Sequence, residues 1–248
     1  MLFLLLALGL SRPPSRASVS GIALVHIPPG TFAMGSAPGE PGRQPDESLH
    51  RVTISRGFWL GTTEVTQAQW TRIMGANPSR FSGCPRCPVE SVTWFDVRKF
   101  LERLNEKVGG GFRLPTEAEW EYACRTGEGS EAERIDDANA NFDARYPLRG
   151  GRPGRYLGRP VPVGSFPADR RGIFDMHGNV WEWCSDGYGA YPTHDVTDPV
   201  GPASAEKKVI RGGSWYFDAA SCRCSARYSH ASSDKGFSVG FRLARDER

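Results

Sequence analysis

The chain has 248 residues, 39% of them hydrophobic and 24% charged, with a formal net charge of +3. This composition is typical of a soluble globular protein, and the mild charge without a dense basic run argues against a nucleic-acid-binding surface. The 29 glycines and 19 prolines are spread along the chain and predict a loop-rich fold with few long helices. Since no repeat or linker interrupts the chain, we expect one domain.

The N-terminus is an unbroken run of nine small and apolar residues, Leu2–Leu10. Such a run is too short to span a bilayer but suits the core of a signal peptide. Ser15 and Ala17 provide a small-x-small cleavage site, although no Lys or Arg precedes the run. We predict a signal peptide over residues 1–17 and an exported domain over 18–248, secreted or in the cell envelope. An N-terminal tail that is not removed is the alternative. No other stretch is long enough to cross a membrane.

Six cysteines in an exported chain favour disulfides. The Cys84–Cys87 motif (Cys-Pro-Arg-Cys) has the spacing of half a zinc site or of a redox pair. A zinc site needs a second pair, and Cys222-x-Cys224 is poorly spaced for one. A redox motif opens a helix, whereas Pro88 follows here. A short loop closed by its own disulfide is the better interpretation.

The first part of the chain alternates strand and turn patterns. Ile22–Ile27 and Thr31–Ser36 each predict a short strand, and Arg51–Leu60 alternates apolar and polar residues as a longer strand does. A helix follows Thr66, which is placed to act as its N-cap.

Two further helices are indicated before the middle of the chain. Phe95–Leu104 is amphipathic, with Phe95 in the predicted core stripe. Phe112 begins a strand that leads into a helix capped by Thr116, with Glu119 at the capping-box position. Residues 126–160 are polar and rich in Gly and Arg, and they predict one long loop.

The segment Asp175–Cys184 (Asp-Met-His-Gly-Asn-Val-Trp-Glu-Trp-Cys) contains two carboxylates, a Gly-Asn turn and two tryptophans within ten residues. If its end is extended, the two tryptophans share one face and Glu182 lies on the other. Asp175 and Glu182, with main-chain carbonyls between them, offer the hard oxygen ligands that calcium prefers. The alternative is a hairpin edge in which Glu182 forms a salt bridge.

The C-terminal third predicts strands separated by loops. Residues 185–208 form a second long loop, and Val209–Trp215 is a short strand ending on two glycines. Val239–Ala244 is a terminal strand that we expect to pair near the start of the chain.

Ordered motifs resemble the formylglycine-generating enzyme (sulfatase-modifying factor) family over about residues 22–245. The motifs are Ile27–Ser36, Thr63–Thr66, Pro88–Trp94, Arg113–Ala123, Gly178–Trp183, Arg211–Trp215 and Gly240–Leu243. The resemblance implies a single α+β domain, poor in regular secondary structure and related to C-type lectins.

The resemblance also implies calcium. By position, the ligands are the side chains of Asp175 and Glu182 and the carbonyls of Gly178 and Val180. A second family site begins at Asn141 with the carbonyl of Phe142. Its later acidic ligand falls on Arg155, which cannot bind a cation, so the second site lacks a ligand.

Catalytic members of the family oxidise a substrate cysteine with oxygen and copper(I), which two thiolates hold. Their cysteines follow the pattern Gly-Gly-Ser-x-x-Cys-x-x-x-x-Cys. In this chain the first position is Phe217 and the second is Cys222. Phenylalanine has no ligand atom, so whether the chain is an enzyme stays open on its sequence.

Other positions carry over from the same resemblance. Cys224 matches a structural cysteine paired with one at Cys124, and only an unusual Cys222 and Cys224 pair would restore a copper site. Ser214 and Trp181 match residues that line the active-site groove. The remaining cysteines allow three pairings, of which one is Cys84–Cys87 with Cys184–Cys222.

Two functions follow. The first is an exported, calcium-stabilised, non-catalytic module that binds a protein or peptide through loop 216–239. The candidate contact residues are Tyr216, Phe217, Asp218, Ser221, Tyr228 and His230. Some proteins of this fold are diversified by retroelements through mutation at adenine, and the segment 216–222 contains only residue types that this process can reach.

The second function is a copper-dependent oxidase of a sulfatase cysteine. We expect calcium as the ion, copper(I) only with catalysis, and a monomer.

Overall fold

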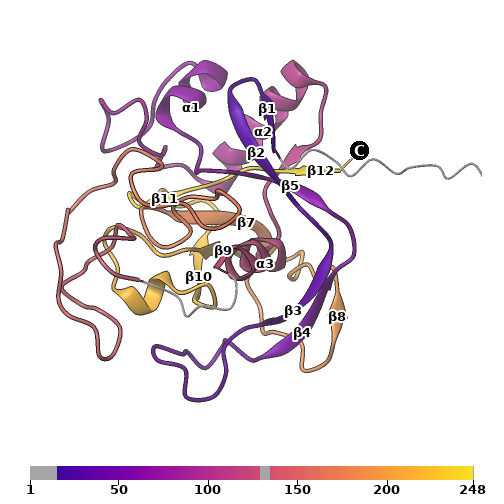
Figure 1. Ribbon diagram of the computed structural model, residues 1–248. Helices are drawn as coiled ribbons and strands as arrows, with labels where there is room; N and C mark the ends of the chain where they lie inside the picture. The colour runs from indigo at the N-terminus through magenta and orange to yellow at the C-terminus, as the bar shows by residue number, and fades with distance from the viewer. Residues whose placement is uncertain (1–15, 129–134, 248) are drawn as a thin grey trace, which may run out of the picture.

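The computed structural model describes residues 16–128 and 135–247 (Figure 1). The first and last strands of the described residues lie in one five-stranded antiparallel sheet of order β1-β2-β5-β12-β6. Its strands are β1 (Arg16–Val19), β2 (Ile22–Ile27), β5 (Phe58–Gly61), β12 (Ala244–Asp246) and β6 (Phe112–Arg113). The predicted terminal strand Val239–Ala244 is wrong in its bounds and largely in its pairing, because Val239 and Gly240 pair with β7 and only Ala244 belongs to β12, which pairs with β5 and β6.

Two smaller sheets complete the architecture. One has the order β10-β9-β7-β11, and the other has the order β3-β4-β8. Their strands are β10 (Arg227–Ala231), β9 (Lys207–Arg211), β7 (Trp181–Gly187), β11 (Val239–Gly240), β3 (Gly30–Met34), β4 (His50–Ile54) and β8 (Val196–Thr197). With three α-helices in the described residues, the α+β class and the loop-rich single domain are confirmed.

The helices begin where their caps are encoded. In α1 (Gln67–Met74), Thr66 and Gln69 form a reciprocal capping box, and α2 (Trp94–Val108) has the same device. In α3 (Glu117–Glu128), the Thr116 hydroxyl accepts the Glu119 N–H at 3.1 Å, while Glu119 accepts the Thr116 N–H at 2.8 Å. The predicted caps at Thr66 and Thr116 are therefore confirmed.

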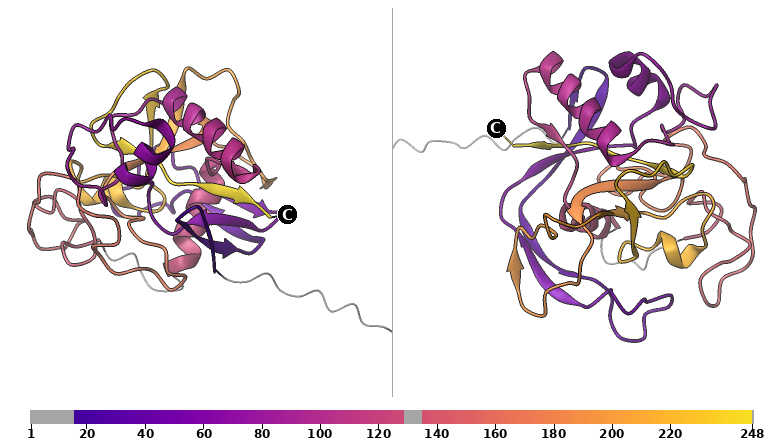
Figure 2. Two further views of the ribbon diagram at one scale, coloured as in Figure 1. Left: turned by 90° about the horizontal axis from the view of Figure 1, so that it is seen from above. Right: turned by 180° about the vertical axis from the view of Figure 1, so that it is seen from behind.

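Helix α3 occupies the middle of the molecule. It packs against β7 and β9 on one side and β3 and β4 on the other, whereas α1 and α2 pack together over the five-stranded sheet (Figures 1 and 2). The 3₁₀ helix η1 (Ala219–Cys222) and the segment 135–170 lie on the opposite side of the molecule from β8. Strands β7 and β9 thus stand between the central helix and the loops.

Several expectations were wrong in detail. The predicted strand Arg51–Leu60 is two strands, β4 and β5, in different sheets, because the chain turns at residues 55–57. Phe95 is 56% exposed instead of lying in the core. The predicted loop 216–239 contains η1 and β10, which pairs with β9.

The two faces of β7 separate as the sequence predicts. Trp181 and Trp183 pack in the apolar cluster that includes the core side of α2. Cys184 packs in a second cluster with Trp120 and Ala123 of α3. The strand is therefore buried on both faces, and Glu182, which lies on the α3 side, is fully buried with it.

Four fully or almost fully buried arginines bind carboxylates from distant segments. They are Arg211 with Glu121, Arg223 with Glu47, Arg227 with Glu117, and Arg242 with Glu182. Because a buried charge is costly without a partner, loss of either member of such a pair destabilises the fold. These pairs tie the loops to the sheets.

Two disulfides connect four of the six cysteines, all of which the structure describes. Cys84 is bonded to Cys87, which closes the short loop proposed from the sequence, and Cys124 of α3 is bonded to Cys224. Cys184 and Cys222 are buried thiols, so the pairing of these two is wrong. They belong to different apolar clusters.

The N-terminal prediction falls largely outside the described residues. Arg16 and Ala17, its last two residues, form β1 and pair with Val25 and Leu24 of β2. The structure does not describe residues 1–15, so the signal peptide stays a prediction.

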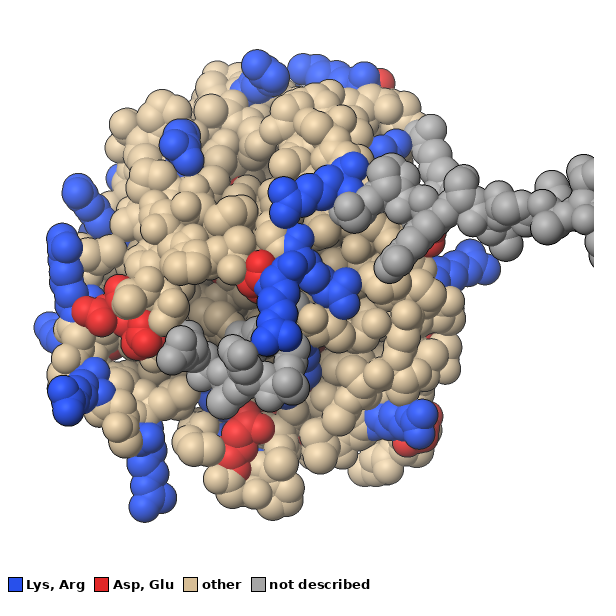
Figure 3. All heavy atoms as spheres, viewed as in Figure 1, with Lys and Arg blue, Asp and Glu red and all other residues tan. Residues whose placement is uncertain are grey.

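Within the described residues no helix is long and apolar enough to cross a membrane. On the face shown in Figure 3, basic side chains lie mostly around the rim.

Asp186, at the end of β7, accepts the N–H of Glu117 at 3.0 Å and so holds the start of α3. Burial, followed by the charge of Glu117, raises the pKa of Asp186 to about 6. The folded state therefore keeps a proton on Asp186 that the unfolded state releases near pH 4. The stabilisation that this proton gives to the fold is complete below about pH 4 and is lost as the pH rises through about 6.

We predict that the free energy of unfolding of the unmodified chain, relative to Asp186→Asn, falls by about 2 kcal/mol between pH 4 and pH 7. Urea denaturation of both proteins across this range measures the difference. A difference that does not change with pH would contradict the raised pKa.

Candidate functional site

The turn before β7 is held in an uncommon backbone conformation. Asp175, Gly178 and Asn179 all have positive φ, at 59°, 96° and 62°. The Gly178 N–H donates to the carbonyl of Gly212 at 2.6 Å, and a Cβ at Gly178 would lie 2.2 Å from the carbonyl oxygen of Asn141. Only glycine fits here, because the turn lies directly against another backbone.

Glu182 is bound on both carboxylate oxygens. Arg242 donates from Nε to Oε2 and from a terminal nitrogen to Oε1, each at 2.6 Å, and Trp120 Nε1 donates to Oε2 at 2.7 Å. The salt-bridge alternative is thus present in the structure. A carboxylate can accept about four hydrogen bonds, so these three leave it room for one further contact.

Two buried carboxylates beside this pair are only half satisfied. Asp175 Oδ2 accepts the N–H of Gly164 at 2.7 Å, and Glu64 Oε1 accepts from Asn179 at 3.0 Å. The second oxygen of each is buried, and apart from a proton that the two acids can share it has no hydrogen-bond partner among the described residues. Burial raises the pKa of both groups, and neighbouring carboxylates raise that of Glu64 further.

The charge balance of this cluster is negative. Glu64, Asp175 and Glu182 bring three carboxylates, against which Arg242 provides one guanidinium. Protons or a cation must offset the excess, and orphaned buried oxygens are the donors that a hard cation needs. No three carboxylate, His or Cys ligand atoms in this part of the described chain lie within 4.8 Å of one another. A calcium ion here would therefore depend on main-chain carbonyls as well.

Glu64 is a member of this carboxylate cluster that sequence reasoning missed. It stands in the Thr63–Thr66 motif, which served only to mark the family resemblance. An acid between Thr63 and the buried Val65 is a weak signal by itself, because an exposed loop has the same pattern. Its full burial beside Asp175 could be learned only from the structure.

The second predicted calcium site is incomplete. Asn141 and Phe142 are buried, and Asn141 Oδ1 lacks a hydrogen-bond partner among the described residues. The Asn141 amide nitrogen donates to Asn179 Oδ1 at 3.1 Å, which joins this position to the first cluster. Arg155 occupies the position of the acidic ligand, and its N–H donates to Asp137 at 2.7 Å.

The described cysteines do not fit a copper(I) site of the family type. Phe217 stands at the first ligand position, and its ring packs edge-on against Trp181, with 5.4 Å between centroids. Cys222 is fully buried, and the sulfur of Cys224 is bonded to Cys124. The two thiolates that copper(I) requires are therefore not assembled at this position.

In place of a thiolate pair, the chain presents linked aromatic rings, which we call the aromatic face. It comprises Phe81, Tyr156, Trp181, Trp215, Tyr216, Phe217, Tyr228 and Phe237. Ring centroids of neighbours lie between 5.2 and 6.3 Å apart. Tyr216 and Tyr228 are each 54% exposed, so the face is open to a partner.

Two arginine side chains lie beside the aromatic face, and two of its indole N–H groups are buried. Arg80 lies 5.3 Å from the ring centre of Phe237, and Arg145 lies 4.4 Å from that of Tyr156. The indole nitrogens of Trp181 and Trp215 are buried without a hydrogen-bond partner among the described residues. A ligand with acceptor oxygens and apolar groups would contact the arginines and the exposed rings, whereas the two indole nitrogens are enclosed by protein and are not accessible to a ligand.

The structure brings together only part of the predicted contact set. Tyr216, Phe217 and Tyr228 meet in the aromatic face. Asp218 caps η1 by accepting from Ser221 N and Oγ at 3.0 and 2.7 Å, so these two side chains are engaged with each other.

The remaining predicted site residues lie in three different surroundings. His230 stacks on Trp183 at 5.7 Å, away from the tyrosines' ring contacts. Ser214 is buried and accepts the N–H of Tyr216 at 3.3 Å. Trp181 packs under Phe217 and Tyr228, as a groove residue would.

The comparisons agree with this architecture. A family model described as the sulfatase-modifying factor enzyme 1-like domain matches residues 11–247. The chain belongs to this family. It is 32% identical over 215 residues to the formylglycine-generating enzyme of Streptomyces coelicolor and 30% identical over 210 residues to that of Mus musculus. These alignments cover 82% and 80% of the chain but 65% and 54% of the relatives, so the chain is similar to part of each.

Solved structures extend the likeness. Treponema denticola variable protein 1 superposes with a TM-score of 0.78 at 26% identity, covering 94% of this chain and 98% of that one. PvdO from Pseudomonas aeruginosa gives 0.77 at 30% identity, covering 91% and 95%. The sulfatase-modifying factor fold therefore spans almost the whole described chain.

We predict that Gly178→Ala destabilises the protein by about 3 kcal/mol or more, because the new methyl group meets the Asn141 carbonyl and φ stays positive. Gly150→Ala is the matched control: φ is 88° there, but nothing lies within 4 Å of its Cβ position. Equal losses in urea denaturation would contradict the close approach as the cause.

Proposed function

We propose that the chain is an exported, calcium-stabilised ligand-binding module of the sulfatase-modifying factor family. Its aromatic face binds a protein or peptide, and it does not carry out the family's oxidation. The observation that carries the proposal is the replacement of the first copper-ligand position by Phe217, whose ring joins Trp181 and Tyr228 in the aromatic face.

Three features support a protein or peptide as the ligand. Tyrosine and tryptophan offer large contact area at low entropic cost, as binding surfaces require. Arg80, which is exposed and lies over the ring of Phe237, offers a cation to the carbonyl or carboxylate oxygens of a peptide. The similarity to Treponema denticola variable protein 1 supports a display surface, and diversification by a retroelement belongs to the same proposal.

The calcium ion would be a structural brace. Asp175 and Glu182 with the carbonyls of Gly178 and Val180 would hold it, and Glu64 would add a carboxylate nearby. The ion would supply positive charge to a buried cluster that lacks it. Because the same turn precedes Trp181, the brace would fix one wall of the aromatic face. The two disulfides agree with export.

We predict that 1 mM calcium raises Tm by about 5–10 °C relative to chelator, as binding with a Kd of about 10 μM would. Asp175→Asn should remove this gain and Glu64→Gln should reduce it, because each removes a negative charge beside the ion. Exposed Asp234→Asn should leave the gain intact. Differential scanning calorimetry measures it, and an unchanged Tm in chelator would contradict the calcium brace.

The binding function is tested with a phage-displayed random peptide library selected against the full chain. We predict that enriched peptides bind with micromolar or better affinity and lose at least about tenfold in affinity on Tyr216→Ser with Tyr228→Ser, since hot-spot aromatics carry such energies. Phe95→Ser is the matched control, because Phe95 is an exposed aromatic on α2 outside this face.

The alternative function, a copper-dependent oxidase, is tested separately. Incubation with copper(I), oxygen and a cysteine-containing sulfatase peptide yields an aldehyde if the chain is an oxidase. Aldehyde formation, or peptides that bind the double tyrosine variant unchanged, would overturn the proposed function.

A further inference from the structure

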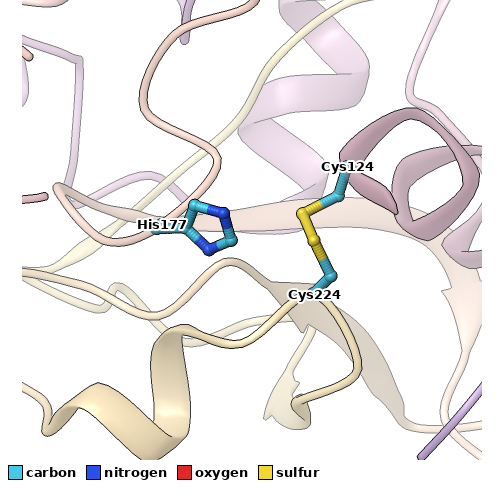
Figure 4. Close-up of side chains that lie close together, drawn as sticks. All are labelled: Cys124, His177 and Cys224. Carbon is cyan, nitrogen blue, oxygen red and sulfur yellow. A yellow bond between two sulfur atoms is a disulfide. The ribbon is translucent and has the colours of Figure 1, made fainter. Parts of the chain in front are cut away.

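A histidine lies beside the Cys124–Cys224 disulfide. Cys124 is on α3, Cys224 follows η1, and His177 is in the turn before β7 (Figure 4). A ring nitrogen of His177 and the two sulfurs all lie within 4.8 Å of one another. Among the described residues, this is the one group of three His, Cys, Asp or Glu ligand atoms that lie so close together.

The histidine is oriented as a metal ligand is. Its Nδ1 lies 2.7 Å from the carbonyl oxygen of Cys222, which can only accept, so Nδ1 carries the hydrogen. In the neutral ring the lone pair is then on Nε2. Figure 4 shows a ring nitrogen directed toward the sulfurs. A backbone carbonyl that fixes the tautomer is the usual outer partner of a metal-binding histidine.

We propose that reduction of the Cys124–Cys224 disulfide creates a zinc site formed by Cys124, Cys224 and His177. A dithiol reductant supplies two electrons and two protons, the S–S bond breaks to two thiols, and the dithiol becomes a disulfide. Zinc then binds both sulfurs as thiolates and the imidazole nitrogen, and the two thiol protons are released. Two thiolates and one imidazole suit a soft d¹⁰ ion, and zinc takes a fourth ligand besides these three.

The fold holds the two cysteines near each other without the disulfide. Arg211 of β9 is fully buried and binds Glu121 of α3, one turn from Cys124. The same guanidinium donates to the carbonyl oxygen of Cys224 at 2.9 Å. Since Arg211 links both chain segments, the sulfurs remain close after reduction, and zinc replaces one cross-link by another.

This site is distinct from the calcium cluster and from the family's copper position. Its ligands are one imidazole and two sulfurs, whereas the calcium cluster offers oxygens. Phe217 and Cys222, which correspond to the copper ligands, contribute no ligand atom to it. The inference also stands apart from the proposed peptide binding, because none of its three residues is part of the aromatic face.

The test uses the full chain carrying Cys84→Ser and Cys87→Ser, because the second disulfide would also give two thiols on reduction. The protein is reduced with a phosphine without oxygen, and cobalt(II) is added as the probe. We expect one equivalent to bind with thiolate-to-cobalt charge-transfer and tetrahedral visible bands, and zinc to displace it. The oxidised protein should show no such bands.

Matched histidine variants decide the ligand set. His177→Ala should weaken cobalt binding at least about tenfold and change the visible bands. If the His177→Ala protein does not fold, the same measurement is made on His177→Asn. His230→Ala, at a partly buried histidine on β10, should bind as the parent does. Near-ultraviolet circular dichroism reports the fold of the reduced protein. Unchanged binding by both His177 variants, absent thiolate bands, or unfolding on reduction would each overturn the proposal.

Discussion

Buried guanidinium–carboxylate pairs hold this loop-rich protein together. Arg242 reaches from the C-terminal segment to Glu182 near the start of β7, and both side chains are fully buried. Removing one member of such a pair leaves an unpaired buried charge, which costs about 3–5 kcal/mol. Long loops bury little apolar surface of their own, so these directed contacts decide where each loop attaches.

The same guanidinium leaves this cluster incompletely neutralised. Arg242 offsets only one of the three carboxylates around the turn before β7. Burial raises the pKa of Glu64 and Asp175, and the charge of neighbouring carboxylates adds to the shift, from Asp175 and Glu182 at Glu64 and from Glu182 at Asp175. The turn can form because Gly178 lies against the Asn141 backbone. The geometry of this turn therefore accounts for three features together: the close backbone contact, the incomplete charge neutralisation and the buried oxygens without partners.

What could be predicted from sequence follows the range of the interactions. Thr116 and Glu119 form a capping box within four residues, so local chemistry was sufficient to place α3. Strand β10, by contrast, begins at Arg227 without apolar alternation and exists because it pairs with β9. Glu182 and Arg242 are 60 residues apart, so their pairing needed the fold. The approach of His177 to the disulfide had no local signal either.

The aromatic face shows how a change in one position alters what a fold offers. A thiolate at position 217 would serve copper chemistry, whereas the phenylalanine ring packs on Trp181 and supports Tyr216 and Tyr228. Position 217 follows the turn at Gly212 and Gly213, and its ring packs against Trp181 of β7. Exposed rings on such a wall favour binding by contact area. Under the proposed function, recognition would therefore depend on the side chains that this fold displays.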